Sequence, residues 1–313
     1  MYISIKNRLI LLLIAFTLLP FILLRIIAYP RVQADLQDVL IRNLDGIGHK
    51  QSELVTNWMR ERIKDSRVIA SNPLIVRCAK ITREDMDYMD ILQYLEVAKI
   101  EYGYRGILIS NEKGSVTITT IDESGINDIS GTDYFKQAME GNTFVSGVIP
   151  SEIPLLNEVG EMELGMPTMF VSAPLKGRDG VVIGVIALRI DIDTLNDLML
   201  SLRLGKTGET YLVNKDGYMI TESRLAMHLK DTGLLKKRSA LELKLVNPET
   251  GELTDGVKQC ITANNGFNTK GYKDYRGQIV LGVWRWLPEF NWGVMAEIDR
   301  DEGYGAAYNL NRI

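Results

Sequence analysis

The sequence is poor in the residues that build metal sites and disulfide frameworks. Among its 313 residues there are two cysteines and two histidines. Cys78 and Cys260 lie far apart, and His49 and His228 lie on different segments. Metal sites need clustered ligands, and disulfide-stapled domains need several spaced cysteines. We therefore expect no metal and no cofactor. Two free thiols are the simplest interpretation, and one long-range disulfide is left open.

The chain also lacks an excess of positive charge. Lys and Arg total 36 against 40 Asp and Glu, which gives a net charge of −4. Nucleic-acid-binding domains usually carry a basic patch, so we predict no nucleic-acid partner. Nucleophiles, bases and acids are not grouped in a way that indicates catalysis, so we expect no enzyme. The hydrophobic share of 46% is that of a folded protein, and the length suggests two domains.

One long apolar segment is present near the amino terminus. It covers Leu9–Ala28, and its first sixteen residues carry no charge. A helix of about 20 apolar residues spans the core of a bilayer. Lys6 and Arg8 precede the segment, so the positive-inside rule places residues 1–8 in the cytoplasm. A cleaved signal peptide is the alternative, but the segment is long for one and lacks an A-x-A site. We expect a single-pass anchor in the inner (cell) membrane, with the rest of the chain in the periplasm or outside the cell.

A long helix is predicted to follow the apolar segment. Over residues 31–70, apolar side chains recur every three, four or seven residues with charges between them. The sequence SNPL at Ser71–Leu74 ends this pattern, because a residue before proline avoids helical dihedral angles. A second helical pattern covers residues 83–99. The apolar stripe of the long helix permits dimerisation. Its positions are Leu36, Leu40, Leu44, Ile47, Leu54, Trp58 and Ile63.

The remainder contains two copies of one unit. The sequences ILISNEKGSVTI (107–118) and TYLVNKDGYMIT (210–221) both indicate a strand, an Asn-x-x-Gly turn and a strand. The sequences GVIALRID (184–191) and GVMAEID (293–299) both indicate a closing strand that ends in an acid. The fold class predicted from this repeat is α+β, with two modules that each hold a five-stranded antiparallel sheet and helices.

The sequence GKTGE at Gly205–Glu209 is similar to the end of a phosphate-binding loop. A Walker A loop needs G-x-x-x-x-G-K-[ST] after a strand and before a helix. Leu200 stands where the first glycine is required, the preceding residues are helical, and a strand follows. Three requirements fail together. We therefore interpret the segment as a helix-to-strand turn, in which Gly205 and Gly208 supply the permissive backbone angles.

Three longer segments resemble double Cache sensor domains. GKTGETYLVNKDGYMITESR resembles the opening of the membrane-proximal module of these domains. DYFKQAMEGNTFVSGV resembles a helix-and-strand segment of the membrane-distal module, and GQIVLGVWRWLPEFNWGVMAEIDRDEGY resembles the closing strands. The resemblance covers roughly residues 10–313. Such regions occur on bacterial chemotaxis receptors, sensor histidine kinases and diguanylate cyclases.

The resemblance implies an architecture and a function. Two tandem PAS-like antiparallel-sheet modules follow the membrane helix and the stalk helix. The membrane-distal module is expected at residues 71–200, the membrane-proximal module at 201–303, and the start of an exit helix at 304–313. A small organic ligand is expected to bind outside the cell in the distal module, with a homodimer formed through the stalk helix. The sequence ends where the family usually enters a second membrane span, so a fragment, a truncated product and a one-span protein are all left open.

The resemblance also suggests where a ligand binds. Amino-acid-sensing members carry an Arg-x-Trp-Tyr segment on a distal helix and an Asp on the last distal strand, which together suit a zwitterion. The Trp-Tyr pair falls on Tyr134 and Phe135, and the Asp falls on Asp191. The Arg position falls on Thr132, which cannot supply the charge, so the amino-acid pattern is broken. Asp191 is either a ligand for a cationic or hydroxyl group or a solvated acid at a strand end.

The remaining candidates are aromatic and hydroxyl side chains. The two aromatic residues either line a pocket or pack the helix on the sheet, and the hydroxyl residues lie on strands that would border the pocket. The predicted ligand-binding residues are Asp191, Tyr134, Phe135, Thr132, Thr119, Ser146 and Ser172. The class of ligand is left open. The alternative function is a ligand-free envelope protein with a structural or partner-binding role, and it predicts a distal module filled by its own side chains.

Overall fold

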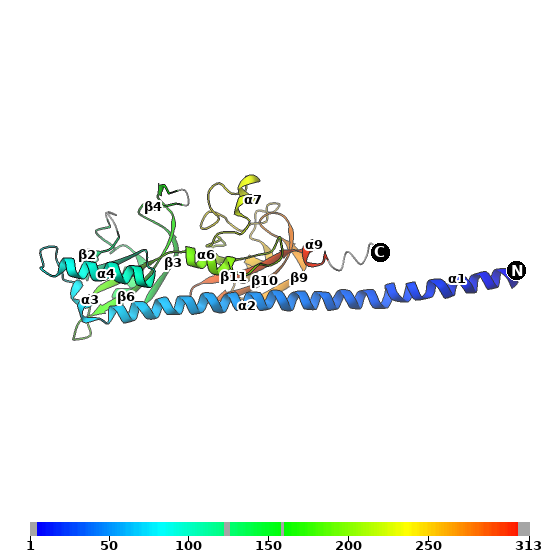
Figure 1. Ribbon diagram of the computed structural model, residues 1–313, viewed down its shortest axis with the longest axis horizontal. Coiled ribbons are helices and arrows are strands. Elements are labelled where there is room, and N and C mark those ends of the chain that lie inside the picture. Colours follow the sequence, from blue (N-terminus) through cyan, green and yellow to red (C-terminus); the bar gives the residue numbers. More distant parts are fainter. Residues whose placement is uncertain (1–4, 122–125, 158–159, 306–313) are drawn as a thin grey trace.

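The computed structural model describes residues 5–121, 126–157 and 160–305. A helical rod runs along the molecule, and two sheet modules lie one after the other along its carboxyl-terminal half (Figure 1). The rod consists of α1 (Ile5–Leu23), a π-helical turn η1 (Leu24–Ala28) and α2 (Tyr29–Ala70). Helix α1 projects beyond the modules and exposes its apolar side chains. Among the described residues, this rod is the one helix long and apolar enough to cross a membrane.

Helix α2 is amphipathic, as the periodic pattern predicts. Leu44, Val55 and Met59 are fully buried against the sheets. Gly48 lies where α2 crosses strand β10 (Ile279–Leu287), and an added Cβ there would come within 3.3 Å of Val283. This glycine therefore permits the close approach of helix and sheet, although glycine lowers the intrinsic stability of a helix.

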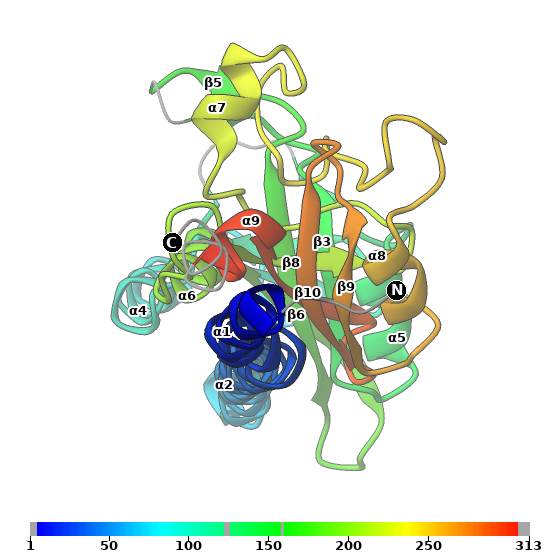
Figure 2. The ribbon, with the colours of Figure 1, turned by 90° about the vertical axis from the view of Figure 1, so that its right-hand side faces the viewer.

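The distal module is the one farther from α1. It contains a five-stranded antiparallel sheet with the order β2-β1-β7-β6-β3. Helices α3 and α4 lie on the same sheet face as α2, and α5 packs on the opposite face (Figure 2). A short hairpin, β4–β5, extends from the end of β3. The elements are α3 (Pro73–Cys78), α4 (Tyr88–Tyr102), β1 (Gly106–Asn111), β2 (Val116–Thr119), α5 (Asp133–Met139), β3 (Phe144–Pro150), β4 (Leu155–Leu156), β5 (Met162–Glu163), β6 (Pro167–Lys176) and β7 (Val182–Ile190).

The proximal module contains a four-stranded antiparallel sheet with the order β8-β11-β10-β9. Helix α6 joins the two modules, and α8 packs on the sheet face opposite α2 (Figure 2). The elements are α6 (Asp193–Leu200), β8 (Glu209–Asn214), α7 (Ala226–Asp231), α8 (Asp255–Cys260), β9 (Gly266–Lys273), β10, β11 (Trp292–Asp299) and α9 (Arg300–Gly303).

The proximal sheet has one strand fewer than the repeat predicts. The segment after the Asn214 turn was expected to form a second hairpin strand like β2. Its Met219 N–H donates instead to the Leu243 carbonyl, and the Leu241 N–H donates back to the Met219 carbonyl. The segment keeps a short contact with β8, because the Asn214 N–H donates to the Tyr218 carbonyl and the Ile220 N–H donates to the Leu212 carbonyl. Its other edge meets the chain from Ser239 to Leu245, and only isolated bridges form.

The two predicted Asn-x-x-Gly turns have the same geometry. In each turn the side-chain oxygen of Asn111 or Asn214 accepts hydrogen bonds from the backbone N–H groups two and four residues later. Gly114 and Gly217 have φ angles of 89° and 81°, which favour glycine. The internal repeat predicted from these sequences is therefore present in the backbone.

The closing strands of the two modules correspond in a register that agrees with the predicted acidic ends, Asp191 and Asp299, and lies one residue away from the predicted Gly-Val starts. Asn111 pairs with Gly184 on β7, and Asn214 pairs with Trp292 on β11. Gly184 therefore corresponds to Trp292, whereas the matched sequences had suggested Gly293. A shift by one residue moves every side chain of a strand to the other face of the sheet, so the correction decides which residues are equivalent.

The corrected register makes Arg189 and Glu297 equivalent residues of the two modules. Arg189 pairs with Gly106 on β1, and Glu297 pairs with Glu209 on β8. Both Arg189 and Glu297 are 2% exposed. Each module therefore carries one buried ionisable side chain at the same position of its closing strand.

Apolar cores lie on both faces of the sheets. The core that faces α2 is continuous through both modules and includes Met59 of α2, Leu188 of β7 and Leu212 of β8. A separate core lies on the opposite face of each sheet. Helix α2 therefore covers one face of both sheets, and the opposite face of each sheet packs a core of its own.

The two cysteines are free and buried in different modules. Cys78 ends α3 and Cys260 ends α8. Burial raises the pKa of Cys78 to about 11 and that of Cys260 to about 12, so both are thiols at neutral pH. The interpretation as two free thiols is confirmed, and the long-range disulfide is excluded.

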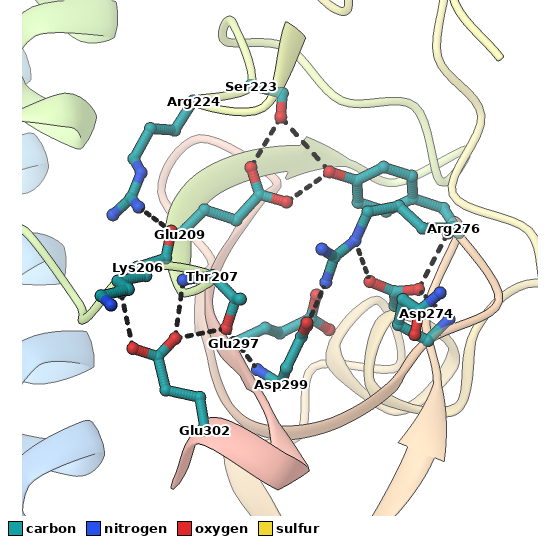
Figure 3. Close-up of polar contacts among 12 residues, drawn as sticks. Lys206, Thr207, Glu209, Ser223, Arg224, Asp274, Arg276, Glu297, Asp299 and Glu302 are labelled. Atoms are coloured by element: carbon teal, nitrogen blue, oxygen red, sulfur yellow. Dashed lines mark hydrogen bonds and ion pairs between the residues drawn. The ribbon is translucent and has the colours of Figure 1, made fainter. Parts of the chain in front are cut away.

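The proximal core contains two carboxyl groups, those of Glu209 and Glu297, on paired residues of β8 and β11 (Figure 3). Glu297 accepts hydrogen bonds from the hydroxyls of Tyr211 at 2.8 Å and Tyr272 at 2.5 Å. Glu209 accepts hydrogen bonds from the hydroxyls of Tyr275 and Ser223. Burial is the main cause that raises the pKa of both groups, and that of Glu297 reaches about 8.

The raised pKa values of this buried pair predict that the protein loses stability as the pH rises. The folded state keeps a proton on Glu297 that the unfolded chain releases near its ordinary pKa of 4.5. Stability is therefore highest below that value, falls between about 4.5 and 8, and is level above, with a loss on the order of 5 kcal/mol. Unfolding of the chain in nanodiscs, followed by tryptophan fluorescence from pH 5 to 9, measures the slope. Glu297→Gln keeps an acceptor without a charge and should reduce this slope, with Glu209 left to contribute the remainder. Glu112→Gln, at an exposed turn, should leave the slope unchanged, and equal slopes in the two variants would contradict the prediction.

Candidate functional site

A cavity of about 270 Å³ opens in the distal module. It lies on the sheet face opposite α2, between α5, the strands β3 and β6, and the segment that leads into the β4–β5 hairpin. Apolar side chains such as Ile149 and Ile153 line it together with hydroxyl groups and a few charged groups. Small-molecule sites have this mixture of apolar walls and few polar groups.

Two stacked aromatic rings form one wall of the cavity. The ring centroids of Tyr134 on α5 and Phe170 on β6 are 4.7 Å apart, and the ring planes differ by 21°. Thr132 positions the tyrosine because it is the N-cap of α5, and its Oγ1 accepts a hydrogen bond from the Phe135 N–H at 3.3 Å. Burial raises the pKa of Tyr134 to about 12, so its hydroxyl stays protonated at neutral pH.

A bulge in β3 forms another part of the wall. The pairing of β3 with β6 shifts between Val145 and Val148, and Gly147 takes a φ of 73°. The Oγ of Ser146 accepts a hydrogen bond from the Phe170 N–H at 2.9 Å and donates to the Gly147 carbonyl. Ser146 therefore replaces a missing backbone pair at the bulge and fixes the strand beside the aromatic wall.

Five of the predicted residues lie at or directly behind the cavity. Thr132, Tyr134 and Ser146 line it. Phe135 is buried in the apolar core on the same sheet face. Ser172 is fully buried on β6, and its Oγ donates to the carbonyl of Tyr134 at 2.7 Å. These last two residues support the wall from behind.

The other two predicted residues lie elsewhere. Thr119 ends β2 at the far edge of the sheet, where its Oγ1 accepts a hydrogen bond from the Ile121 N–H. Asp191 follows β7, pairs with Arg105 at 2.5 Å, and accepts a hydrogen bond from the Asp193 N–H. The sheet order therefore separates Thr119 from the cavity, and an ion pair engages Asp191 outside it.

Arg189 is a cavity residue that sequence reasoning missed. Its Nε donates to Thr168 Oγ1 at 3.0 Å, and its Nη2 donates to Ser151 Oγ at 3.2 Å. Burial, followed by repulsion from Arg105, lowers the pKa of Arg189 to about 10. The guanidinium is therefore still charged at neutral pH.

One signal in the sequence would have found Arg189. In a strand, alternate residues face the same side. Arg189 therefore shares a face with Val185 and Ala187, both of which are buried in the core opposite α2. A charged residue at an inward position of an otherwise apolar strand indicates a site, because burying an unpaired charge is costly.

A larger cavity of about 830 Å³ lies between the two modules beside the β4–β5 hairpin. Glu163 of this hairpin pairs with Lys237 at 2.8 Å and with Arg238, both of the proximal module. Hydrogen bonds from Lys237 and Asn157, together with the charge of Arg238, hold the pKa of Glu163 at about 2. Arg189 lines both cavities and forms part of the wall between them.

Three of the hydroxyl groups that line the cavity are hydrogen-bonded to the backbone. The hydroxyls of Thr132, Ser146 and Ser151 donate to backbone carbonyls and not to a base. Within residues 5–121, 126–157 and 160–305, no three His, Cys, Asp or Glu side chains are grouped so that they would hold a metal ion. A site of this kind can hold and orient a small molecule.

A family model of the Cache domain matches residues 32–307, so the chain belongs to the Cache domain family. Among solved structures, the chain is similar to the ligand-binding domain of the Campylobacter jejuni chemoreceptor Tlp3 in complex with 4-methylisoleucine, with 15% identity, a TM-score of 0.57, and coverage of 86% of this chain and 94% of that chain. It is also similar to the ligand-binding domain of the Pseudomonas aeruginosa chemoreceptor PctC in complex with GABA, with 17% identity, a TM-score of 0.55, and coverage of 82% of this chain and 99% of that chain. For the sensor domain of the Vibrio cholerae histidine kinase DctB, the identity is 11%, the TM-score is 0.55, and the match covers 85% of this chain and 98% of that chain.

These comparisons confirm the predicted family and the α+β fold of two tandem modules. The chain has the fold of chemoreceptor and histidine kinase sensor domains. No curated protein matches the sequence.

Removal of the Ser172 hydroxyl should destabilise the wall of the cavity. Ser172→Ala deletes a buried hydrogen bond to the Tyr134 carbonyl and should lower the free energy of unfolding by about 1 kcal/mol. Ser201→Ala removes a hydroxyl that donates at the same 2.7 Å to the Leu198 carbonyl, but in an exposed position, and should cost less than about 0.5 kcal/mol. Urea unfolding in nanodiscs compares the two variants; equal losses would contradict the supporting role of Ser172.

Proposed function

We propose that this chain is the extracytoplasmic small-molecule sensing region of a membrane-anchored bacterial signal-transduction receptor. The ligand binds in the cavity of the distal module. The observation that carries the proposal is the cavity itself, because a purely structural module would fill this space with its own side chains. The stacked wall of Tyr134 and Phe170 supports it, since such a wall offers an apolar surface to a small organic molecule.

The proposal includes the placement of the chain at the membrane. Exposed apolar side chains on α1 and the basic residues that precede the apolar segment support a single-pass anchor with the modules outside the cytoplasm. The division into a distal module at 71–200 and a proximal module at 201–303 belongs to the same proposal. The expected start of an exit helix at 304–313 falls mostly outside the described residues.

Dimerisation through the stalk helix is also part of the proposal. Most of the predicted apolar stripe packs within the chain, because Leu44 is fully buried, Leu40 and Ile47 pack beside it, and Trp58 and Ile63 pack against the main core. Val32 and Val39, on the part of α2 that precedes the modules, are exposed. Apolar side chains at this spacing are available to pack against a second copy of the helix. The ligands named for the similar structures are amino acids in several cases, which supports a small organic ligand without identifying the one bound here.

A ligand screen with a blocked cavity tests the proposal. In nanodiscs, the chain is melted with amino acids, amines, organic acids, purines and sugars, and a ligand at 100 times its Kd should add about 2.7 kcal/mol of stability. Gly131 lines the cavity, and an added Cβ there meets nothing within 4 Å. Gly131→Trp should therefore fill the cavity and abolish the response, whereas Gly131→Ala should keep it.

Two outcomes would overturn the proposal. If no compound of the panel shifts the melting temperature, the ligand-free envelope protein becomes the better interpretation. If a shift persists in Gly131→Trp, the ligand binds outside the distal cavity, and the larger cavity between the modules becomes the candidate.

A further inference from the structure

The buried guanidinium of Arg189 faces no carboxylate in the part of the chain that the structure describes. Its hydrogen-bond acceptors are the neutral hydroxyls of Thr168 and Ser151. An arginine has five N–H donors, and within the described residues Arg189 makes two hydrogen bonds. The side chain is 2% exposed, lines the distal cavity and carries a charge. A buried charge without a partner of opposite sign costs several kcal/mol.

The charged groups nearby do not remove this cost. Arg105 repels Arg189, and Asp191 attracts it through space but forms its ion pair with Arg105. Asp133 and Glu152 also line the cavity, but both are exposed, and neither makes a hydrogen bond or ion pair to Arg189. The inner end of the cavity therefore keeps a net positive charge.

The equivalent position in the proximal module shows the contrast. There Glu297 is neutral at pH 7 and accepts hydrogen bonds from Tyr211 and Tyr272, whose rings fill the surrounding core. The proximal module thus satisfies its buried group with its own side chains. The distal module leaves a cavity beside Arg189.

We propose that the Arg189 guanidinium binds a carboxylate of the ligand in the distal cavity. The inference rests on the proposed sensing function. A planar guanidinium pairs with a carboxylate through two parallel hydrogen bonds, and one such group balances one positive charge. The cavity of about 270 Å³ limits the ligand to a small acid whose body contacts Tyr134 and Phe170. Arg189 on β7 thus supplies the positive charge that Thr132, at the start of α5, cannot supply.

Matched pairs of acids and amides test the inference. The chain in nanodiscs is titrated with butyrate, benzoate and succinate, with butyramide, benzamide and succinamide, and with norvaline and γ-aminobutyrate as amine-bearing acids. At least one acid should raise the melting temperature, and its amide should not. Arg189→Met should lower the affinity for that acid by ~30-fold or more, because it removes one partner of a buried charged pair. The amine-bearing acids then report whether the exposed carboxylates of Asp133 and Glu152 also bind an ammonium group.

Two variants control for structural damage. Arg189→Met removes an uncompensated charge and should melt no lower than wild type without ligand. Arg105→Met removes a paired arginine that lines only the larger cavity and should keep the response to the acid.

Three outcomes would overturn the inference. They are an amide that binds as tightly as its acid, an acid response that survives Arg189→Met, and a ligand-free Arg189→Met protein that melts well below wild type. The first two leave small-molecule sensing intact and so differ from failure of the proposed function, in which no compound of the broader screen shifts the melting temperature.

A second inference comes from the GKTGE segment, which does hold an anionic group (Figure 3). The backbone N–H groups of Lys206 and Thr207 donate to the carboxylate of Glu302 at 2.8 and 2.7 Å, and the Thr207 hydroxyl donates at 2.6 Å. Gly205 has a φ of 62°, and an added Cβ would lie 2.7 Å from the Glu302 oxygen. The guanidinium of Arg224 donates to the carbonyls of Gly205 and Lys206 and stabilises the loop.

This contact lies where three segments of the chain meet. The loop follows α6, which comes from the distal module, and Glu302 lies on α9, the last described helix. Leu204 packs with Leu44 of α2 and Ile298 of β11, and Tyr304 packs against the same cluster. The linker between the modules, the long helix and the carboxyl-terminal segment are thus joined at one point.

We infer that Glu302 is a built-in carboxylate ligand of the loop, and that this latch ties the carboxyl-terminal segment to the linker between the modules. Charge-assisted hydrogen bonds to backbone N–H groups are directional, so a displaced linker would pull Glu302 with it. A shift that begins on β7 would reach α9 through α6 and this loop.

Hydrogen exchange and a spin label test the latch in the full chain. Glu302→Ala should speed exchange of the Lys206 and Thr207 amides by about tenfold or more, because it removes their charged acceptor. A nitroxide on Gly305→Cys should become more mobile; Cys78 and Cys260 are buried and should not react. Asp301→Asn changes an exposed acid of the same helix and should alter neither measurement.

Three results would overturn the latch. They are unchanged exchange at both amides, equal acceleration throughout the proximal sheet, and a spin label whose mobility does not respond to Glu302→Ala.

Discussion

The packing of α2 against both sheets is the constraint on which the rest of the structure depends. Val55 and Met59 are fully buried in a core that is continuous through the two modules, and Leu44 is fully buried in a smaller cluster with Leu281 and Val283 of β10. Buried Gln51 adds hydrogen bonds to the carbonyl of Met199 on α6 and to Thr210 on β8, at the junction of the modules. One face of each sheet is thereby committed to the helix, and only the opposite face is free to differ between modules.

The two modules use that free face in different ways. At one position of the closing strand, the proximal module places Glu297 among tyrosine hydroxyls, and the distal module places Arg189 beside a cavity. A protonated carboxyl group can be satisfied by neutral donors and acceptors, but a guanidinium remains charged and needs an anion. The same backbone therefore surrounds a filled core in one copy and a cavity in the other, through the chemistry of one residue and its neighbours.

Local sequence patterns predicted much of the fold, because turns and amphipathic helices are set by nearby residues. The Asn-x-x-Gly turns, the long helix and its end before Pro73 agree with the structure. Arg189 was not predicted, because its importance depends on which face of the sheet it occupies. That face follows from strand register, and matching the closing strands by their Gly-Val sequences gave a register one residue out. The missing fifth strand of the proximal sheet depends on contacts with residues 239–245, which no local pattern contains.

The fixed helix face also determines how the modules can communicate. Two carboxylates connect them elsewhere: Glu163 of the β4–β5 hairpin with Lys237 and Arg238, and Glu302 with the loop that follows α6. The first connection begins beside the cavity, because the Ser151 hydroxyl that contacts Arg189 lies in the segment leading to the hairpin. The second connection begins at β7, which carries Arg189, because β7 leads into α6 and α6 leads into the loop that binds Glu302. A ligand whose carboxylate draws the guanidinium of Arg189 would therefore act on both connections, through Ser151 on one side and through β7 on the other.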